Sequence, residues 1–161
     1  MRLYLLRHGT AEERGTGDDA ERALVDKGRK QCRRVAALLG RLGVEPALVL
    51  TSPLRRARET AQETLLALGV EERVVAEGRL APGGSVSAAV EAVLAAGWGL
   101  EHVLVVGHEP MLSELAAQLV VDPPGALHLD LRKSGLVEIE VLSRHPPRGA
   151  LIGLIRPAHL E

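Results

Sequence analysis

The sequence M-R-L-Y-L-L-R-H-G-T, from Met1 to Thr10, determines how the rest of the chain can be arranged. The residues from Leu3 to Leu6 form an unbroken apolar run that is short for a helix and typical of a strand buried on both faces of a parallel sheet. The run ends in Arg7 and His8, just where ligands bind in open α/β sheets, beyond the carboxyl ends of the strands. The pattern therefore predicts a cation and an imidazole at a binding edge, although an N-terminal strand followed by an ordinary polar turn would look the same.

A second apolar run ends in a similar way. The segment from His102 to Val106 is followed by Gly107 and His108, and then by Pro110 near the start of an expected helix. Exposed backbone N–H groups at the start of a helix attract anions. A lone histidine at such a position is more often a capping residue than a catalyst, but two strands of one small sheet that both end in histidine favour a shared site.

The third strand end carries arginines. A buried strand from Ala47 to Thr51 runs into Ser52-Pro53, which predicts a helix N-cap followed by proline at the first helical position. Arg55, Arg56 and Arg58 then fall in the first turns of that helix, where the helix dipole disfavours cations. A bound anion would offset this cost, so the cluster is a weak indication of anion binding.

The remaining periodicity completes an α/β fold: a three-layer α/β/α sandwich around a mostly parallel sheet with an antiparallel edge strand and no lid domain. We expect residues 1–161 to form a single domain. The other expected elements are a helix capped by Asp26 and ended by Gly43, the end of the second helix at Gly69, a strand Arg73–Ala76, a helix from a Ser85 cap to near Gly97, a half-exposed antiparallel strand Leu136–Leu142, a last strand Ala150–Ile155, an alternating segment Leu127–Leu131 that adds a short strand, and a mobile loop Glu12–Glu21.

Composition excludes several classes of function. The formal net charge is −1, from 20 basic and 21 acidic residues, which implies no general affinity for nucleic acid or for an anionic membrane. The single cysteine, Cys32, excludes an internal disulfide and a cysteine-rich metal site, and we expect it to be a half-buried structural thiol. No apolar run approaches the ~20 residues that span a bilayer and no signal peptide precedes the first strand, so a cytoplasmic location is expected.

The groups at the strand ends define a chemistry. Arg7, His8, Arg56 and His108 would place two guanidinium groups and two imidazoles around one pocket, which suits a doubly charged tetrahedral anion, a phosphoryl group. A metal site is a poor alternative, because the arginines would repel a cation and no carboxylate stands at ligand spacing beside either histidine. We therefore expect neither a metal nor another cofactor.

Three motifs resemble those of a known family. R-H-G at Arg7–Gly9, T-S-P-L-R-R-A-R-E-T at Thr51–Thr60 and V-G-H-E-P at Val106–Pro110 are similar to the motifs of the histidine phosphatase superfamily, which has the phosphoglycerate mutase-like fold. Within that superfamily, the short chain and the stretch L-A-P-G-G at Leu80–Gly84 are most similar to the SixA-type phosphohistidine phosphatases. The resemblance extends from Met1 to about residue 119.

The resemblance implies a role for each matching residue. His8 would accept the phosphoryl group, Arg7 would bind the phosphate, and His108 would donate a hydrogen bond to the phosphoryl oxygens. The phosphate-binding arginine of the second motif immediately precedes alanine, which makes it Arg56. Larger members place a glutamate general acid after the third strand, and Glu77 is the nearest match, although SixA-type proteins lack a clear equivalent.

The expected function is therefore that of a phosphatase with a phosphohistidine intermediate. Only about 30 residues separate Glu77 from His108, so no insertion is left to build a lid, and an open site suits a phosphoryl group presented on a protein surface, above all protein phosphohistidine. The alternatives are a phosphatase or mutase acting on a small phosphate ester, and a non-catalytic domain that binds phosphorylated ligands. The sequence predicts no nucleic-acid or membrane partner and leaves the oligomeric state open.

Overall fold

Six strands form one mixed sheet in the computed structural model, which describes residues 1–71 and 74–160. The strands are β1 (Arg2–Arg7), β2 (Leu48–Thr51), β3 (Val74–Ala76), β4 (His102–Gly107), β5 (Leu136–Arg144) and β6 (Pro147–Ile155). Their order across the sheet is β3-β2-β4-β1-β5-β6. The first four in this order are parallel, β5 is antiparallel to β1, and β6 is antiparallel to β5. The predicted mostly parallel sheet is confirmed.

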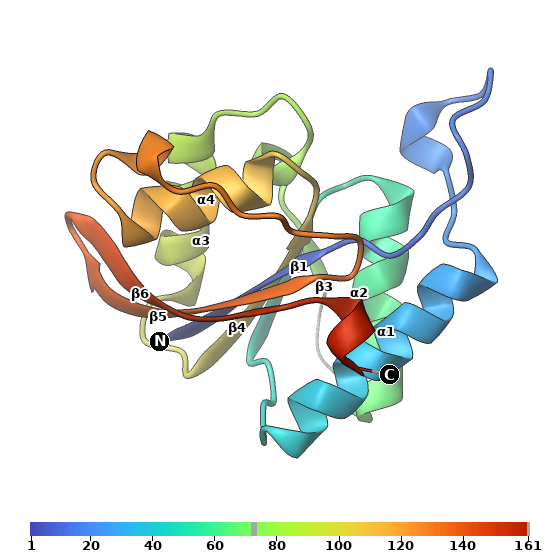
Figure 1. The fold of residues 1–161 in the computed structure, drawn as a ribbon, viewed down its shortest axis with the longest axis horizontal. Coiled ribbons are helices and arrows are strands. Elements are labelled where there is room, and N and C mark those ends of the chain that lie inside the picture. The colour runs from blue at the N-terminus through green and yellow to red at the C-terminus, as the bar shows by residue number, and fades with distance from the viewer. Residues whose placement is uncertain (72–73, 161) are drawn as a thin grey trace.

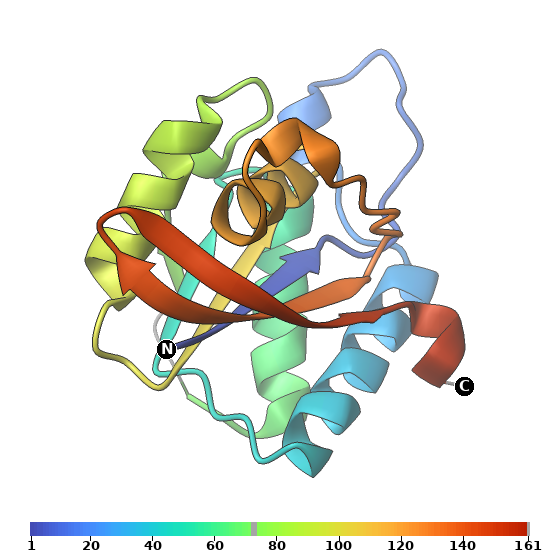
Figure 2. The same ribbon diagram turned by 60° about the vertical axis from the view of Figure 1, so that its left-hand side comes forward.

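Four helices cover the two faces of the sheet (Figures 1 and 2). Their bounds are α1 (Asp26–Arg41), α2 (Arg55–Leu68), α3 (Val86–Gly97) and α4 (Met111–Val120). Each face of the sheet has its own hydrophobic core, one under α1 and α2 and the other under α3 and α4. Tyr4 and Leu6 belong to the core on the α1–α2 face, whereas Leu3 and Leu5 belong to the core on the α3–α4 face. Successive side chains of a strand point to opposite faces, so the unbroken apolar run of β1 is buried by both helix layers, as predicted.

The register of the two central strands aligns their carboxyl ends. In the parallel ladder between β1 and β4, Leu6 lies opposite Val106 and Arg7 opposite Gly107. The backbone N–H of His8 continues the ladder by donating to the Gly107 carbonyl at 3.0 Å. His8 and His108 therefore leave the sheet at the same level.

Two helices start differently from the sequence prediction. Asp26 is the first residue of α1 and not its cap, because Val25 occupies the N-cap position without a side-chain hydrogen bond. Ser52 does not cap α2 either, since the helix begins at Arg55 after Leu54. The physical reason is that Ser52 still follows the sheet: its N–H donates to the Val106 carbonyl at 2.9 Å, so the chain cannot turn into a helix there.

Other predicted boundaries hold. Ser85 caps α3 by accepting a hydrogen bond from the Ala88 N–H, and α3 ends at Gly97. Gly69 ends α2 in the left-handed conformation, at φ 75°, which glycine adopts without strain. Cys32 is fully buried rather than half-buried, and burial raises the pKa of its thiol to about 11, as suits a structural residue.

The C-terminal third departs more from the prediction. The segment 127–131 forms no strand within the described residues, and β6 begins at Pro147, three residues earlier than predicted. Because β6 pairs outside β5, the predicted antiparallel strand is second from the edge of the sheet. Arg73, the predicted start of the third strand, lies outside the described residues. None of the described helices is long and apolar enough to cross a membrane.

Candidate active site

Three neighbouring strands of the sheet end together and place both histidines in one site. Strands β1, β4 and β2 lie in the centre of the sheet, and His8, His108 and Ser52 directly follow them. The ring centroids of His8 and His108 are 5.0 Å apart, and the two residues are only 7% and 3% exposed. The structure therefore brings together two imidazoles that are 100 positions apart in the sequence.

The imidazole of His8 is held so that one nitrogen keeps a lone pair. Its Nδ1 lies 2.7 Å from the carbonyl oxygen of Gly9, and a carbonyl only accepts, so Nδ1 carries the proton and Nε2 the lone pair. Burial lowers the pKa of His8 to about 4, and the charges of Arg56 and Arg7 act in the same direction. At neutral pH this side chain is an uncharged imidazole, which is the nucleophilic form.

Glycine residues allow the turn after His8. The N–H of Gly9 donates to the Thr60 hydroxyl on α2 at 3.0 Å. A Cβ on Gly9 would lie 3.1 Å from the Gly28 carbonyl oxygen, and a Cβ on Gly28 would lie 2.2 Å from the carbonyl oxygen of Thr10. Only glycine at position 28 lets α1 approach this turn so closely. The sequence prediction did not identify Thr60 or Gly28, because their roles depend on a contact between distant segments.

Two arginines border the imidazoles, and each has an unused donor. Arg7 donates from Nη1 to the Leu131 carbonyl at 2.8 Å, and Arg56 donates to Asp19. Among the described residues, Arg7 Nε, Arg56 Nε and His108 Nδ1 are buried nitrogens without a hydrogen-bond partner. A buried unsatisfied polar group costs ~1–3 kcal/mol. These three nitrogens are therefore the candidate donors to a bound oxyanion.

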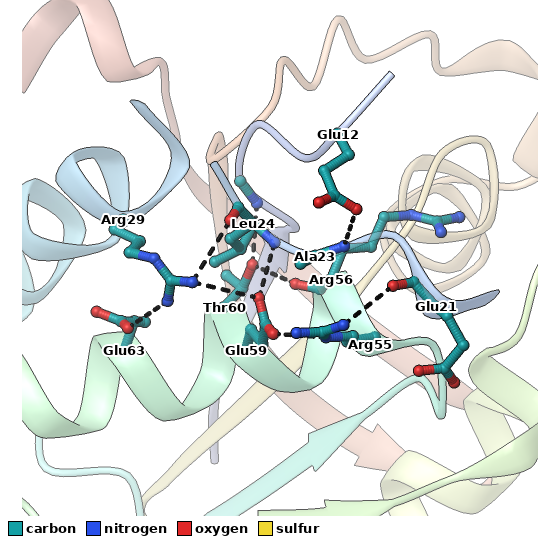
Figure 3. Close-up of polar contacts among 11 residues, drawn as sticks. Glu12, Glu21, Ala23, Leu24, Arg29, Arg55, Arg56, Glu59, Thr60 and Glu63 are labelled. Atoms are coloured by element: carbon teal, nitrogen blue, oxygen red, sulfur yellow. Dashed lines mark hydrogen bonds and ion pairs between the residues drawn. The ribbon is translucent and has the colours of Figure 1, made fainter. Parts of the chain in front are cut away.

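Arg55 lies in a different environment from Arg56. The Arg55 side chain is 45% exposed and donates to Glu59 at 2.8 Å, whereas the Arg56 side chain is 5% exposed. Figure 3 shows Arg55 between Glu59 and the carbonyl of Glu21, and shows Glu59 also accepting from the Leu24 N–H, at 2.7 Å. Arg55 thus ties the loop before α1 to helix α2.

That loop, residues 12–21, ends against Arg56. Asp19 accepts from Arg56 through its backbone carbonyl at 2.7 Å and through its carboxylate at 3.1 Å. Arg22 also donates to the Asp19 carboxylate, at 2.8 Å. The segment predicted as a mobile loop beside the strand end therefore has a defined contact with the site, which sequence spacing could not reveal.

The structure places Glu77 in an ion pair. Its carboxylate accepts from Arg79 Nε at 2.8 Å and from the Arg79 N–H at 2.9 Å. These hydrogen bonds hold the pKa of Glu77 below its usual value. A carboxylate kept in its ionised form is poorly suited to donate a proton. The general-acid role of Glu77 stays a prediction, and this environment disfavours it.

Glu109 is a further acidic residue at the site that the sequence prediction passed over. It follows His108, and its Oε1 is buried without a partner among the described residues. Burial raises the pKa of this carboxyl group, and a hydrogen bond to Ser113 and the charge of Arg7 oppose the rise only in part. Glu109 lies inside the motif V-G-H-E-P, and its position next to His108 was the sequence feature that could have identified it.

The donor set does not resemble a metal site. In residues 1–71 and 74–160, no three His, Cys, Asp or Glu side chains are grouped so that they could hold a metal ion. The positive charges of Arg7 and Arg56 act on both His8 and His108. This arrangement provides a positive field for an anion.

The buried imidazoles predict an unusual pH dependence. Burial lowers the pKa of His8 to about 4 and that of His108 to about 3, from 6.5. Between pH 6.5 and these lowered pKa values, the unfolded chain binds more protons than the folded one. The free energy of unfolding is therefore expected to decrease as the pH falls from 6.5 towards 4. NMR titration should give midpoints for both rings well below 6.5, and His8→Ala should flatten the pH dependence measured by urea unfolding. Midpoints near 6.5 would contradict the burial argument.

Comparisons with known proteins show which family the chain resembles in sequence. The family model of the histidine phosphatase superfamily (branch 1) matches residues 3–81. An uncharacterized protein of Picosynechococcus is 38% identical over 147 residues, 85% of this chain and 83% of that protein. Phosphohistidine phosphatase SixA of Escherichia coli is 33% identical over 121 residues, 74% of each chain.

Solved structures show the same fold. The structure of the protein histidine phosphatase SixA complexed with tungstate matches with a TM-score of 0.90 and 26% identity, over 100% of both chains. The native structure of mycobacterial glucosyl-3-phosphoglycerate phosphatase matches with a TM-score of 0.69 and 22% identity, over 93% of this chain and 96% of that one. The second match shows only that the fold is shared.

Proposed function

This chain belongs to the histidine phosphatase superfamily and is a phosphatase, and from that premise we propose that it hydrolyses protein phosphohistidine through a covalent intermediate on His8. One observation carries the proposal. The neutral imidazole of His8, with its proton on Nδ1, lies in a site bordered by the unpartnered buried nitrogens of Arg7, Arg56 and His108. Phosphoryl transfer requires a positioned nucleophile and hydrogen-bond donors that stabilise the charge on the phosphoryl oxygens.

The proposed reaction has two displacements at phosphorus. Nε2 of His8 attacks in line, the new P–N bond forms, and the bond from phosphorus to the substrate nitrogen breaks, while that nitrogen takes up a proton from solvent water. Arg7, Arg56 and His108 stabilise the charge on the equatorial oxygens. Water then attacks the phosphohistidine, the bond to Nε2 breaks, and the water proton is released as inorganic phosphate leaves.

The surroundings of the site support a protein substrate. The segment from Glu77 to His108 is used up by a short 3-10 turn at Gly78–Leu80, α3 and β4, which leaves no inserted lid. Two hollows flank the site: one of about 610 Å³ is lined in part by Glu109 and Ser113, and one of about 570 Å³ is lined in part by Arg7 and Lys133. A phosphorylated side chain on a protein surface could reach His8 while neighbouring residues of that protein contact both hollows.

A small phosphate ester is the second candidate substrate. A hollow of about 610 Å³ has the size of ordinary small-ligand pockets, and the mycobacterial phosphatase of the same fold is named for glucosyl-3-phosphoglycerate, a small phosphate ester. The leaving group separates the two candidates, because a phosphoramidate nitrogen departs readily once protonated, whereas an alkoxide needs a stronger general acid.

A direct comparison of substrates tests the proposal. We expect a phosphorylated histidine-containing transfer domain to be hydrolysed with a higher kcat/KM than sugar phosphates at equal concentration. Glu77→Gln should change the phosphohistidine rate by less than about two-fold, because Glu77 is already ionised and paired with Arg79. A sugar phosphate turned over at ~10⁵ M⁻¹s⁻¹ or more, with the phosphoprotein far slower, would instead identify a metabolic phosphatase.

A further inference from the structure

Ser52 has a hydroxyl group that the helix does not use. The residue is fully buried at the end of β2, and its Oγ accepts a long hydrogen bond of 3.4 Å from the Leu54 N–H. The same oxygen lies 2.8 Å from Nε2 of His108. The shorter contact joins Ser52 to the site.

The direction of this hydrogen bond follows from the inventory of protons. A serine hydroxyl has one hydrogen to donate, and in the described residues Nε2 of His108 is the acceptor within reach of it. If Nε2 carried a proton and donated to Ser52, the hydroxyl hydrogen would be buried without an acceptor, at a cost of ~1–3 kcal/mol. The hydroxyl therefore donates, and Nε2 of His108 accepts.

An accepting Nε2 fixes the rest of the ring. The neutral imidazole has one proton, which must then be on Nδ1, the buried nitrogen of His108 that has no partner in residues 1–71 and 74–160. Burial lowers the pKa of His108 to about 3, so at neutral pH the ring depends on this single proton to act as a donor. The opposite tautomer would present a lone pair to the phosphoryl oxygens and repel them.

We propose that Ser52 is a positioning residue that holds His108 in the Nδ1–H tautomer, so that a neutral imidazole donates a hydrogen bond to the transferring phosphoryl group. The inference rests on the proposed function for the use of that donor, but the tautomer itself is a property of the free protein. His8 and His108 then share one tautomer, each fixed by a different buried partner: the Gly9 carbonyl for His8 and the Ser52 hydroxyl for His108. One ring offers a lone pair to phosphorus and the other offers an N–H to oxygen.

The chain contains a matched control for removal of the hydroxyl. Thr51 is also fully buried at the end of β2, and its hydroxyl donates to the Ser52 carbonyl at 3.1 Å and to neither imidazole. Thr51→Val and Ser52→Ala therefore each remove one buried hydroxyl from the same strand end. Only Ser52→Ala removes the partner of His108.

The test combines NMR with kinetics. Long-range ¹H–¹⁵N correlation spectra of the free protein, with His108 assigned through His108→Gln, should show a protonated Nδ1 and an unprotonated Nε2 at pH 7. In Ser52→Ala we expect protonated Nε2 to appear and kcat to fall at least ten-fold, with KM changing less than three-fold, whereas Thr51→Val should stay within about three-fold of the parent in both constants.

Two results would overturn the proposal. One is a protonated Nε2 in the parent protein, a measurement that stands even if Ser52→Ala does not fold. The other is a Ser52→Ala protein with an unchanged tautomer and the kcat of Thr51→Val. A protein with the expected tautomer but no activity on any phosphohistidine substrate would contradict the proposed function and not the placement of the proton, so the two failures are distinguishable.

Discussion

Replacing His8 by alanine is expected to reduce turnover by about 10⁴-fold or more, the scale on which loss of a covalent nucleophile acts. The charges of Arg7 and Arg56 act directly on His8, whose Nε2 carries the lone pair. The fold should survive, because within residues 1–71 and 74–160 the side chain of His8 has one hydrogen bond, to the carbonyl of the next residue, and the adjoining β1 ladder is backbone. When turnover of the parent protein is quenched without acid, mass spectrometry should find the phosphate on His8.

His102→Ala is the matched control for that experiment. His102 begins β4, the strand that ends at Gly107 next to His108, so it lies at the opposite end of this strand from the site. Its loss should leave kcat/KM within about two-fold. Phosphate found on Ser52 or His108, or a His8→Ala protein that retains turnover with normal circular dichroism, would show that the nucleophile is another group.

The parts of the fold that were predictable are those determined by local patterns. The apolar runs of β1 and β4 indicated strands buried on both faces, because such a run has no polar face to turn to solvent. Both runs end in a histidine, which indicated that the two imidazoles lie at the same edge of the sheet. Gly69 and Ser85 were correct as helix boundaries, since their backbone and side-chain chemistry acts within one turn.

The parts that could not be predicted depend on distant contacts. Ser52 looked like a helix cap by its neighbours in sequence, but its backbone is paired with Val106, which keeps it in the sheet and turns its hydroxyl to His108. The contact of Asp19 with Arg56 joins residues 37 positions apart through the fold of a loop. Glu109 is adjacent to a predicted residue, yet only its burial distinguishes it from an ordinary surface carboxylate.

The arginines are expected to differ sharply in their contribution to catalysis. Arg56→Ala and Arg7→Ala should each lower kcat/KM by a factor that corresponds to at least ~3 kcal/mol of transition-state stabilisation, because each removes a buried, unpartnered Nε donor and a positive charge that acts on both imidazoles. Arg55→Ala should cost less than ~1 kcal/mol, because Arg55 is 45% exposed and its partner Glu59 keeps a second hydrogen bond from Leu24. Steady-state kinetics on one phosphohistidine substrate compares the three variants.

The pair Arg55 and Arg56 makes this test sensitive to a one-residue error. The motif S-P-L-R-R-A contains both, and the two side chains leave α2 in directions that differ by about 100° of helical rotation. Arg58→Ala serves as the control for loss of one positive charge from the same helix, since Arg58 is exposed. If Arg55→Ala proved the costlier change, the phosphate clamp would lie on the exposed side of α2, and the buried, unpartnered Nε of Arg56 would need a different explanation from the oxyanion proposed here.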